Sequence, residues 1–418
     1  MKKKILGLIL ITGILSTNCQ KEELTTPQLK PDSDVTNQTL KHGDIIPNSY
    51  IVVYKQTSKL SNIDEMFFEV KKGEIRNFDV NNNNLDEIYD KKTQTYRKEY
   101  EIIFTESEIT PDKIERIYTG AIYGVSAKLT KEEVEILRMD KRIDFIEPNR
   151  FVELSYIVED ETISNEKAQT VPWGISRVGY TNYSGDKVAW IIDTGVQSNH
   201  PDLNVWTGGC RSFVTGQTYN DGNGHGTHVA GTIGAINNTI GVVGVAAGVP
   251  VAAVKVLDNS GNGSYAAIIS GIDYVRSNAW AGDVANMSLG GPASTALDNA
   301  VISLANKGVW CVIAAGNDYK NANNYSPARV NGTYIYTISS HDVNNKFSTF
   351  SNYGNPPIDW CAPGTSIYST WINSSYKTIS GTSMATPHVV GIRLMGAPRS
   401  GGYVTSDPDG SADRRAVR

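Results

Sequence analysis

The sequence predicts an α/β protein with a mostly parallel sheet and helices on both faces, preceded by a small α+β domain. From Lys187 onward, short apolar segments alternate with longer segments of helical character, and this alternation is typical of parallel strands joined by helices. Between residues 45 and 154 the pattern differs, because β-branched and aromatic segments surround one capped helix. With 418 residues, the chain is long enough for both units.

Composition limits the classes of function. The chain is 40% hydrophobic and 20% charged, as is usual for a globular protein. The net charge of -5 provides no basic face for nucleic acid, so we expect no nucleic-acid partner.

Residues 1–19 are interpreted as a targeting signal. Three lysines precede the apolar run 5–15, which is too short to span a bilayer. The segment 15–19 (LSTNC) resembles a bacterial lipoprotein signal, in which Cys19 is lipidated and becomes the mature N-terminus. The alternative is an ordinary secretory signal with an incidental cysteine.

Residues 20–42 are polar and predict a flexible tether. Residues 20–23 (QKEE) resemble a sorting tag of surface lipoproteins. We therefore expect an exported protein with a lipid anchor, in the outer membrane or at the cell surface, or a secreted protein if the signal is an ordinary one.

Residues 43–155 form the small α+β domain. Strands are expected over 49–54, 125–129 and 143–148. Between the last two, Thr130 and Glu133 form the pattern of a capping box, which starts a helix that runs to about residue 139.

Two further segments are interpreted as irregular. The run 81–84 (NNNN) and the charged stretch after it resemble an insertion in a loop. Residues 156–171 are acidic and polar without periodicity, which predicts a connector.

The large domain is expected over residues 172–418. Its predicted strands are 187–192, 249–256, 284–287 and 309–314, and its predicted helices are 228–236 and 265–275.

Three short segments of this domain carry acyl-transfer chemistry. Asp193 lies in 191–195 (IIDTG), His225 in 224–232 (GHGTHVAGT) and Ser383 in 381–387 (GTSMATP). An acid, an imidazole and a hydroxyl are the parts that turn an alcohol into a nucleophile. Asp193 ends an apolar strand, and the carboxyl ends of strands in open α/β sheets face the ligand crevice.

The helix signals support the nucleophile and argue against a metal site. Pro387 is tolerated only in the first turn of a helix, so Ser383 lies at a helix start, where free N–H groups favour an anion. His225 and His228 have the spacing of a metal pair, but no third ligand is nearby in the sequence. We expect His228 to make a structural hydrogen bond.

Together, the three segments and their Asp–His–Ser order resemble the signatures of the subtilisin-like serine proteases (subtilases). Within this family the chain resembles the proteinase K-like group over about residues 172–391, in the segments 221–228, 325–328, 350–354 and 363–367. The resemblance implies a subtilisin-like fold and a monomeric serine endopeptidase of broad specificity that acts on proteins or peptides without a catalytic cofactor.

The family also implies an inhibitory propeptide. Residues 43–155, above all the last 30, resemble the propeptide domain of subtilases, which would make the chain a self-inhibited zymogen that is cut within 156–171. The alternative is an unrelated N-terminal domain.

The resemblance assigns a role to each site residue. Ser383 attacks, His225 transfers the proton, and Asp193 orients His225, while Asn317 and the Ser383 N–H hold the oxyanion. An extended substrate is expected to pair with two edges of the cleft. The substrate-binding residues implied are Ser288, Leu289, Gly290, Gly261, Gly263, Tyr265, Ala315 and Gly316.

Calcium is the metal that the resemblance implies. Asp359 resembles a calcium-ligating carboxylate, with carbonyls near Thr333 and Ile335 as partners. The acidic tail 407–413 is interpreted as a solvated loop, with calcium binding as the alternative.

The three cysteines outside the signal allow one disulfide. Cys210 and Cys361 could pair in an exported protein, whereas Cys311 lies in an apolar run and is expected in the core.

The end of the chain departs from the family pattern after Gly391. Arg393 interrupts the apolar helix that should follow Ser383, and Pro398 lies soon after, so residues 391–418 are expected to be atypical and weakly packed.

Two other functions are compatible with parts of the sequence. A damaged C-terminus would leave a peptide-binding pseudoprotease, against which the complete four-residue site argues. A processing protease of narrow specificity usually displays acidic pockets, which the sequence does not identify.

Overall fold

The fold is that of a computed structural model, which describes residues 39–71, 84–158 and 168–418. Residues Leu40–Arg418 form one unit by their contacts. The predicted signal with Cys19, most of the tether, the run 81–83 and the middle of the connector lie outside the described residues. No helix in the described part of the chain combines the length and the apolar character that a membrane crossing requires.

The small α+β domain is built on an antiparallel sheet. Its own strands are β1 (Ile45–Tyr54), β2 (Ile114–Thr119), β3 (Tyr123–Lys128) and β4 (Ile143–Glu153), in the order β4-β1-β3-β2. Its helices are α1 (Ser58–Lys71), α2 (Asn84–Glu106), the 3-10 turn η1 (Pro111–Lys113) and α3 (Lys131–Arg138). The predicted capping box is present at α3, where Thr130 and Glu133 bond to each other's backbone N–H groups.

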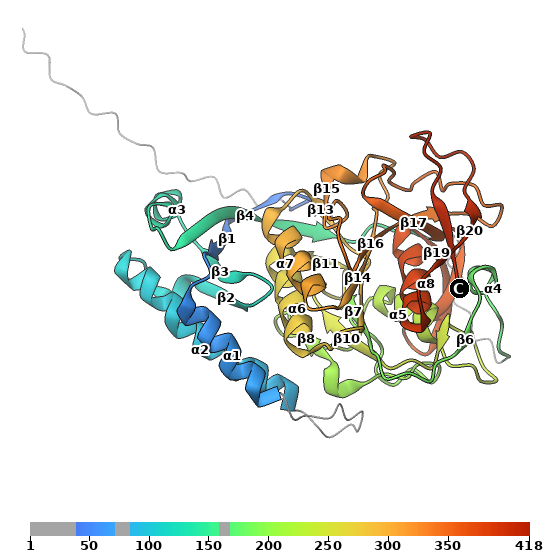
Figure 1. Cartoon of the computed structure of the whole chain (residues 1–418), viewed down its shortest axis with the longest axis horizontal. Coiled ribbons are helices and arrows are strands. Elements are labelled where there is room, and N and C mark those ends of the chain that lie inside the picture. The colour runs from blue at the N-terminus through green and yellow to red at the C-terminus, as the bar shows by residue number, and fades with distance from the viewer. Residues whose placement is uncertain (1–38, 72–83, 159–167) are drawn as a thin grey trace, which may run out of the picture. The chain divides into compact units, whose positions relative to one another are not determined.

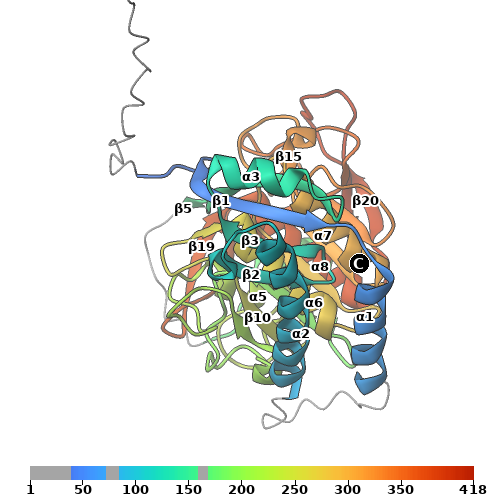
Figure 2. The ribbon, with the colours of Figure 1, turned by 90° about the vertical axis from the view of Figure 1, so that its left-hand side faces the viewer.

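One prediction for this domain was wrong. The charged stretch after residue 84 is the long helix α2, not an irregular loop. Tyr96, Tyr100, Ile103 and Phe104 lie about one helical turn apart and are buried in the domain core, which explains why this stretch folds as a helix. Helices α1 and α2 lie side by side (Figure 2).

The large domain contains a nine-stranded sheet in the order β20-β21-β17-β16-β14-β12-β7-β10-β8. All neighbouring pairs are parallel except β20 and β21. The strands are β7 (Ala189–Asp193), β8 (Arg211–Ser212), β10 (Val251–Lys255), β12 (Val284–Met287), β14 (Trp310–Ala314), β16 (Ile335–His341), β17 (Ile358–Pro363), β20 (Arg399–Tyr403) and β21 (Arg414–Val417).

Helices cover both faces of this sheet, as the sequence predicts (Figure 1). One face packs against α6 (Tyr265–Asn278) and α7 (Thr295–Asn306), and the other against α5 (His225–Gly234) and α8 (Thr382–Met395). Successive strand residues such as Trp190 and Ile191 pack into the two cores on opposite faces of the sheet, because successive side chains of a strand point to opposite faces.

Shorter elements complete the large domain: α4 (Trp173–Val178), β5 (Ile157–Val158), β6 (Thr181–Asn182), η2 (Thr207–Gly209), β9 (Ala246–Ala247), β11 (Asn262–Ser264), β13 (Gly291–Pro292), η3 (Ala322–Asn324), β15 (Tyr325–Ser326), β18 (Ile367–Trp371) and β19 (Ser375–Ser380). Strand β5 belongs to the predicted connector and pairs with β19. Strand β11 pairs with β4 of the small domain, so one sheet joins the two domains.

The end of the chain is more regular than predicted. Arg393 does not interrupt α8, which continues to Met395. The Arg393 guanidinium lies 4.1 Å from the centre of the Trp310 ring, so a cation–π contact offsets part of the cost of burying the charge. Strand β21 then extends the main sheet next to β17 instead of forming a weakly packed tail.

The possible disulfide between Cys210 and Cys361 is absent, because both thiols, like that of Cys311, are free and buried. Cys210 lies against β10, where its sulfur accepts a hydrogen bond from the Ala253 N–H, and Cys361 lies in β17. Four strands separate β10 from β17, which corresponds to about 20 Å or more at the usual strand spacing. A disulfide needs Cα atoms within about 7 Å.

Candidate active site

The acid and the base predicted from the sequence lie together at one edge of the main sheet. Asp193 is the last residue of β7, and His225 is the first residue of α5. Both side chains are fully buried, and Oδ1 of Asp193 lies 2.7 Å from Nδ1 of His225. This contact favours the neutral tautomer with its proton on Nδ1, which leaves Nε2 as an acceptor. Nε2 is buried and has no hydrogen-bond partner among the described residues.

The glycines on both sides of His225 allow the backbone to approach its neighbours more closely than any other residue would. Gly224 has a φ of +115°, and a Cβ at this position would lie 2.3 Å from the Trp371 side chain. A Cβ on Gly226 would lie 2.0 Å from the carbonyl oxygen of Gly195, which lies just beyond the end of β7. Any larger residue at either position would therefore displace the imidazole or the backbone that holds it.

The topology of the sheet explains why these residues meet. Strand β7 lies between β10 and β12, so the strand order reverses at β7. Strands β7, β12 and β14 are parallel neighbours, and their carboxyl ends form one edge. Asp193 ends β7, Ser288 follows β12, and Asn317 lies just beyond β14. Open α/β sheets bind ligands at such reversal points.

Ser383 is the second residue of α8 and is 4% exposed. Its hydroxyl donates to the carbonyl of Ser288 at 3.3 Å, and the Ser288 hydroxyl donates to the carbonyl of Ser383 at 2.9 Å. The hydroxyl is therefore not hydrogen-bonded to Nε2 of His225 in this structure. Catalytic hydrogen bonds are often formed only once a substrate is bound for reaction. The Ser383 N–H lies in the first turn of α8, where backbone donors have no helical partner.

The orientation of the Asn317 side chain is fixed by its neighbours. Its Oδ1 accepts hydrogen bonds from the N–H and the hydroxyl of Thr382, at 2.8 and 2.9 Å. The NH₂ group must therefore point the other way, into the cleft. There it donates to the carbonyl oxygen of Ser155 at 2.7 Å.

The last residues of the small domain occupy the cleft. Strand β4 pairs with β11 through residues 151–153, and the Leu154 N–H donates to the carbonyl of Gly261 at 3.0 Å. The ring of Tyr156 lies 5.5 Å from the ring of His225, measured between centres. Residues 152–156 line a pocket of about 620 Å³ together with Ser383 and Asn317. The Ser155 carbonyl is thus hydrogen-bonded to the Asn317 side chain, while the Tyr156 ring lies next to the His225 ring.

Comparisons with known proteins agree with this geometry. A profile of the subtilase family matches residues 184–394, which include Asp193, His225 and Ser383. The chain belongs to the subtilase family. A second profile, that of the I9 peptidase inhibitors, matches residues 49–155 and ends at Ser155. This subtilase is accordingly a serine protease with an inhibitory propeptide, and the small domain is that propeptide.

Individual relatives and a solved structure match more than half of this subtilase. It is 38% identical over 323 residues to a cuticle-degrading protease from Metarhizium anisopliae. This match covers 73% of this chain and 79% of the relative. It is 42% identical over 299 residues to the subtilisin-like serine protease AsES from Sarocladium strictum, which covers 67% and 72% of the two chains. The crystal structure of a cold adapted subtilisin-like serine proteinase matches with a TM-score of 0.52 and 39% identity, over 59% of this chain and 97% of that one.

Most of the predicted substrate-binding residues lie at this cleft. Ser288, Leu289, Gly290, Ala315 and Gly316 line the pocket, and Gly261 and Gly263 bond to or pair with the propeptide strand. Tyr265 is placed differently. Its side chain is fully buried at the start of α6 and its hydroxyl donates to the carbonyl of Pro292, so it supports the wall of the cleft from behind.

A segment without a recognisable local pattern also reaches the cleft. His42, which was assigned to the tether, accepts a hydrogen bond on Nδ1 from the Glu153 N–H at 3.1 Å. Next to it, the Gly43 N–H donates to the carbonyl of Phe151 at 2.9 Å. The propeptide strand therefore has β11 on one side and residues 42–43 on the other. No local pattern marks this contact, because its partners are 111 residues apart in the sequence.

The structural role predicted for His228 is confirmed. Its Nε2 lies 2.9 Å from the Ile367 carbonyl and 3.2 Å from the Lys377 carbonyl. Burial lowers the pKa of His228 to about 3, so the ring is neutral and donates to these carbonyls.

The calcium prediction at Asp359 rests on few ligands. One oxygen of Asp359 accepts the Thr337 N–H at 2.9 Å, and burial raises the pKa of Asp359 to about 6. Within residues 39–71, 84–158 and 168–418, no cluster of three or more His, Cys, Asp or Glu side chains could hold a metal ion. Calcium there would depend on backbone carbonyls such as those of Thr333 and Ile335, which suit it chemically.

Proposed function

We propose that this subtilase cuts its own chain between Ser155 and Tyr156 and afterwards hydrolyses other proteins with the same triad. The hydrogen bond from Asn317 to the Ser155 carbonyl carries this proposal, because an oxyanion donor must lie about 3 Å from the oxygen of the bond that breaks. The position of Tyr156 over His225 supports it, since the proton must pass from this imidazole to the leaving amine.

The proposed reaction assigns a step to each side chain. Rotation of Ser383 about χ1 turns its hydroxyl from the Ser288 carbonyl toward Nε2 of His225, which takes the proton as the oxygen attacks the carbonyl carbon. Asp193 stabilises the imidazolium through the 2.7 Å contact with Nδ1. Asn317 and the Ser383 N–H stabilise the oxyanion.

The tetrahedral intermediate then collapses. The bond to the amide nitrogen breaks, His225 gives the proton to that nitrogen, and water hydrolyses the acyl-enzyme by the same steps in reverse. All of these groups belong to this chain, and none of the steps calls for a cofactor.

The proposal sets domain boundaries. The propeptide ends at Ser155 and the mature protease begins at Tyr156, the first residue of the region 156–171 in which the sequence places the cut. Residues 156–171 then become the N-terminal arm of the mature enzyme, ahead of the domain 172–418.

Cleavage between Ser155 and Tyr156 is the expected result when the full chain is purified and allowed to mature. N-terminal sequencing and intact mass should give a fragment that begins at Tyr156, and a serine-directed inhibitor should block its formation while labelling Ser383. A mature fragment that begins beyond Tyr156, with no transient species at this position, would contradict the proposed bond.

The lining of the cleft favours broad specificity for the side chains of the substrate. Ser155 places a small polar residue at the scissile position, and the nearby wall is formed by Ala314, Ala315 and Gly316, which carry no charge. Affinity would come mainly from backbone pairing with β11, as the propeptide strand does here. We therefore expect the protease to accept many different side chains at the bond that it cuts.

We retain the lipid anchor at Cys19 as a proposal that rests on the sequence. The uncut precursor, which still carries Cys19, is expected to partition into detergent, and Cys19→Ala should release it into the aqueous phase. If the variant and the parent partition alike, the signal is an ordinary secretory one.

Calcium at Asp359 is also retained as a proposal. Calcium that binds the folded state but not the unfolded state stabilises the fold by mass action. Excess EDTA should therefore lower the Tm of the mature protease, and Asp359→Asn should abolish this EDTA effect. An equal EDTA effect in parent and variant would place any calcium elsewhere.

A further inference from the structure

A lysine is buried beside Asp193, on the side away from the cleft. Lys255 is the last residue of β10, which pairs in parallel with β7 so that Lys255 lies opposite Asp193. Its side chain is fully buried. Lysine is almost never fully buried unless its charge has partners, because removing an ammonium from water is costly. The groups around this lysine therefore bear on the chemistry of the site.

The Lys255 ammonium is bonded to the residue that follows Asp193. Its Nζ donates to the carbonyl of Thr194 at 2.5 Å. The Thr194 N–H donates to Oδ1 of Asp193 at 2.7 Å, and the Thr194 hydroxyl accepts from the Gly226 N–H at 2.9 Å. Gly226 follows His225 in α5. Thr194 thus connects the lysine both to the acid and to the helix that carries the base.

A second buried carboxylate lies near the same lysine. Asp221 is 4% exposed and holds the turn that precedes His225. It accepts four hydrogen bonds at 2.7–3.0 Å, from the N–H groups of Asn223, Gly224 and Thr227 and from the Thr227 hydroxyl. Burial lowers the pKa of Lys255, and the charges of Asp221, Asp193 and Asp258 act in the opposite direction, so that they favour the ammonium.

The other buried ionisable groups around His225 and Lys255 carry a negative charge or none. They are Asp193 in β7, Asp221 before α5, Asp258 after β10, His228 in α5, His388 in α8 and Tyr156 in the connector. Burial lowers the pKa of His228 and of His388 to about 3, so both rings are neutral. Burial raises the pKa of Tyr156, so its phenol is neutral as well.

A further cation lies on the other side of α5. Lys377 in β19 stacks on the Trp371 ring, with its Nζ 5.1 Å from the ring centre. Its side chain is partly exposed, so solvent screens its charge. The charge of Lys255 lies in the interior, where screening is weaker.

We propose that Lys255 is a positioning residue of the protease, which opposes protonation of His225 and holds Asp193 in place through Thr194. The inference rests on the proposed function, in which neutral His225 takes the proton of Ser383. Two buried carboxylates by themselves would favour the imidazolium and leave little of the base free. A buried cation behind them offsets part of this attraction, so that His225 stays neutral and able to accept a proton.

The pH dependence of kcat/KM provides the test. Lys255→Met keeps the length of the side chain and removes its charge. We expect the acidic limb of the profile to move to higher pH by about half a pH unit or more, because a nearby positive charge no longer opposes the imidazolium. On that limb kcat/KM should fall about threefold or more, and the loss should shrink as the pH rises. KM should not change, since a fully buried side chain cannot touch the substrate.

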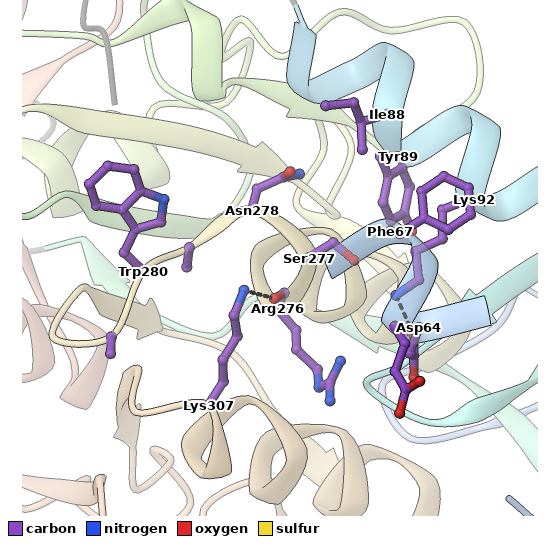
Figure 3. Close-up of a pocket in the computed structure, with 13 residues that line it drawn as sticks. Asp64, Phe67, Ile88, Tyr89, Lys92, Arg276, Ser277, Asn278, Trp280 and Lys307 are labelled. Carbon is purple, nitrogen blue, oxygen red and sulfur yellow. Dashed lines mark hydrogen bonds and ion pairs between the residues drawn. The ribbon is translucent and has the colours of Figure 1, made fainter. Parts of the chain in front are cut away.

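Lys307→Met is the matched control. The Lys307 Nζ also donates to a backbone carbonyl, that of Arg276, at 2.5 Å, but Lys307 lies at the exposed end of α7, on the face of the sheet opposite to α5 (Figure 3). Its substitution should leave the acidic limb in place. A limb at the same pH in Lys255→Met and the parent would overturn the proposal. So would a loss that is equal at every pH, because that is the effect of a lysine with a purely structural role.

Two measurements keep the test decisive if Lys255→Met does not fold. Lys255→Arg retains the charge and should keep the acidic limb where the parent has it, whereas a displaced limb counts against the proposal. In the unsubstituted chain, ¹⁵N NMR of the lysine Nζ groups should show the slowly exchanging group of Lys255 as an ammonium throughout the acidic limb. A neutral amine there would overturn the proposal. A parent without protease activity would instead refute the proposed function.

Discussion

Replacing Ser383 with alanine is expected to lower kcat about a millionfold, the scale of loss when a triad nucleophile is removed. The precursor should also remain uncut between Ser155 and Tyr156, because the same hydroxyl is proposed to attack that carbonyl. Folding should be unaffected, since among the described residues the Ser383 hydroxyl bonds only to the Ser288 carbonyl, at 3.3 Å. Hydrolysis of casein and gel analysis of the precursor measure both effects.

The double variant of Ser383 and His225 separates catalysis from structure. Groups that act in one step are not additive, so Ser383→Ala combined with His225→Ala should be no less active than either single variant. If Ser383→Ala matures at the normal rate in the absence of other proteases, the proposed nucleophile is wrong.

Replacing Asn317 with alanine should lower kcat by about 10²–10³-fold with little change in KM. The side-chain NH₂ is the group that lies 2.7 Å from the Ser155 carbonyl, where negative charge develops in the reaction. The variant should process its propeptide slowly for the same reason. Steady-state kinetics on a peptide substrate and a time course of maturation measure the two losses.

Asn317→Asp and Thr382→Val show whether the loss comes from the donor or from its support. The aspartate retains an oxygen for Thr382 but places a second oxygen toward the oxyanion, so its loss should exceed that of alanine. Thr382→Val removes one of the two hydrogen bonds that orient Asn317 and should cost less than Asn317→Ala. Equal activity of the aspartate variant and the parent would exclude a donor role.

Local patterns predicted the parts of the fold that depend on local forces. The capping box at Thr130 and Glu133 is present, and the predicted strand 284–287 has the same limits in the structure. The charged helix α2 was missed because the many charged residues of this stretch mask the helical spacing of the buried Tyr96, Tyr100 and Phe104. Strand β21 was missed because it pairs with the distant strand β17, and β20 in turn pairs with β21.

The candidate site shows the same division. Asp193, His225, Ser383 and Asn317 lie in segments with their own signals, and the ends of neighbouring strands bring the acid and the amide to one edge. The proposed scissile bond and the His42 contact have no local signal, since each depends on residues that are more than 100 positions apart in the sequence. Tyr265 follows the substrate loop in sequence, but its large ring is buried in the core instead of lining the cleft.

The pairing of β5 with β19 bears on whether self-cutting goes to completion. Residues 157 and 158 are fixed to β19 by backbone contacts, so the new amine of Tyr156 stays beside the acyl group that it has just left. A neighbouring amine at high effective molarity competes with water for that acyl group and can rejoin the chain. The cut and uncut forms would then interconvert. Maturation would become irreversible only after β5 has dissociated from β19 and water has hydrolysed the ester.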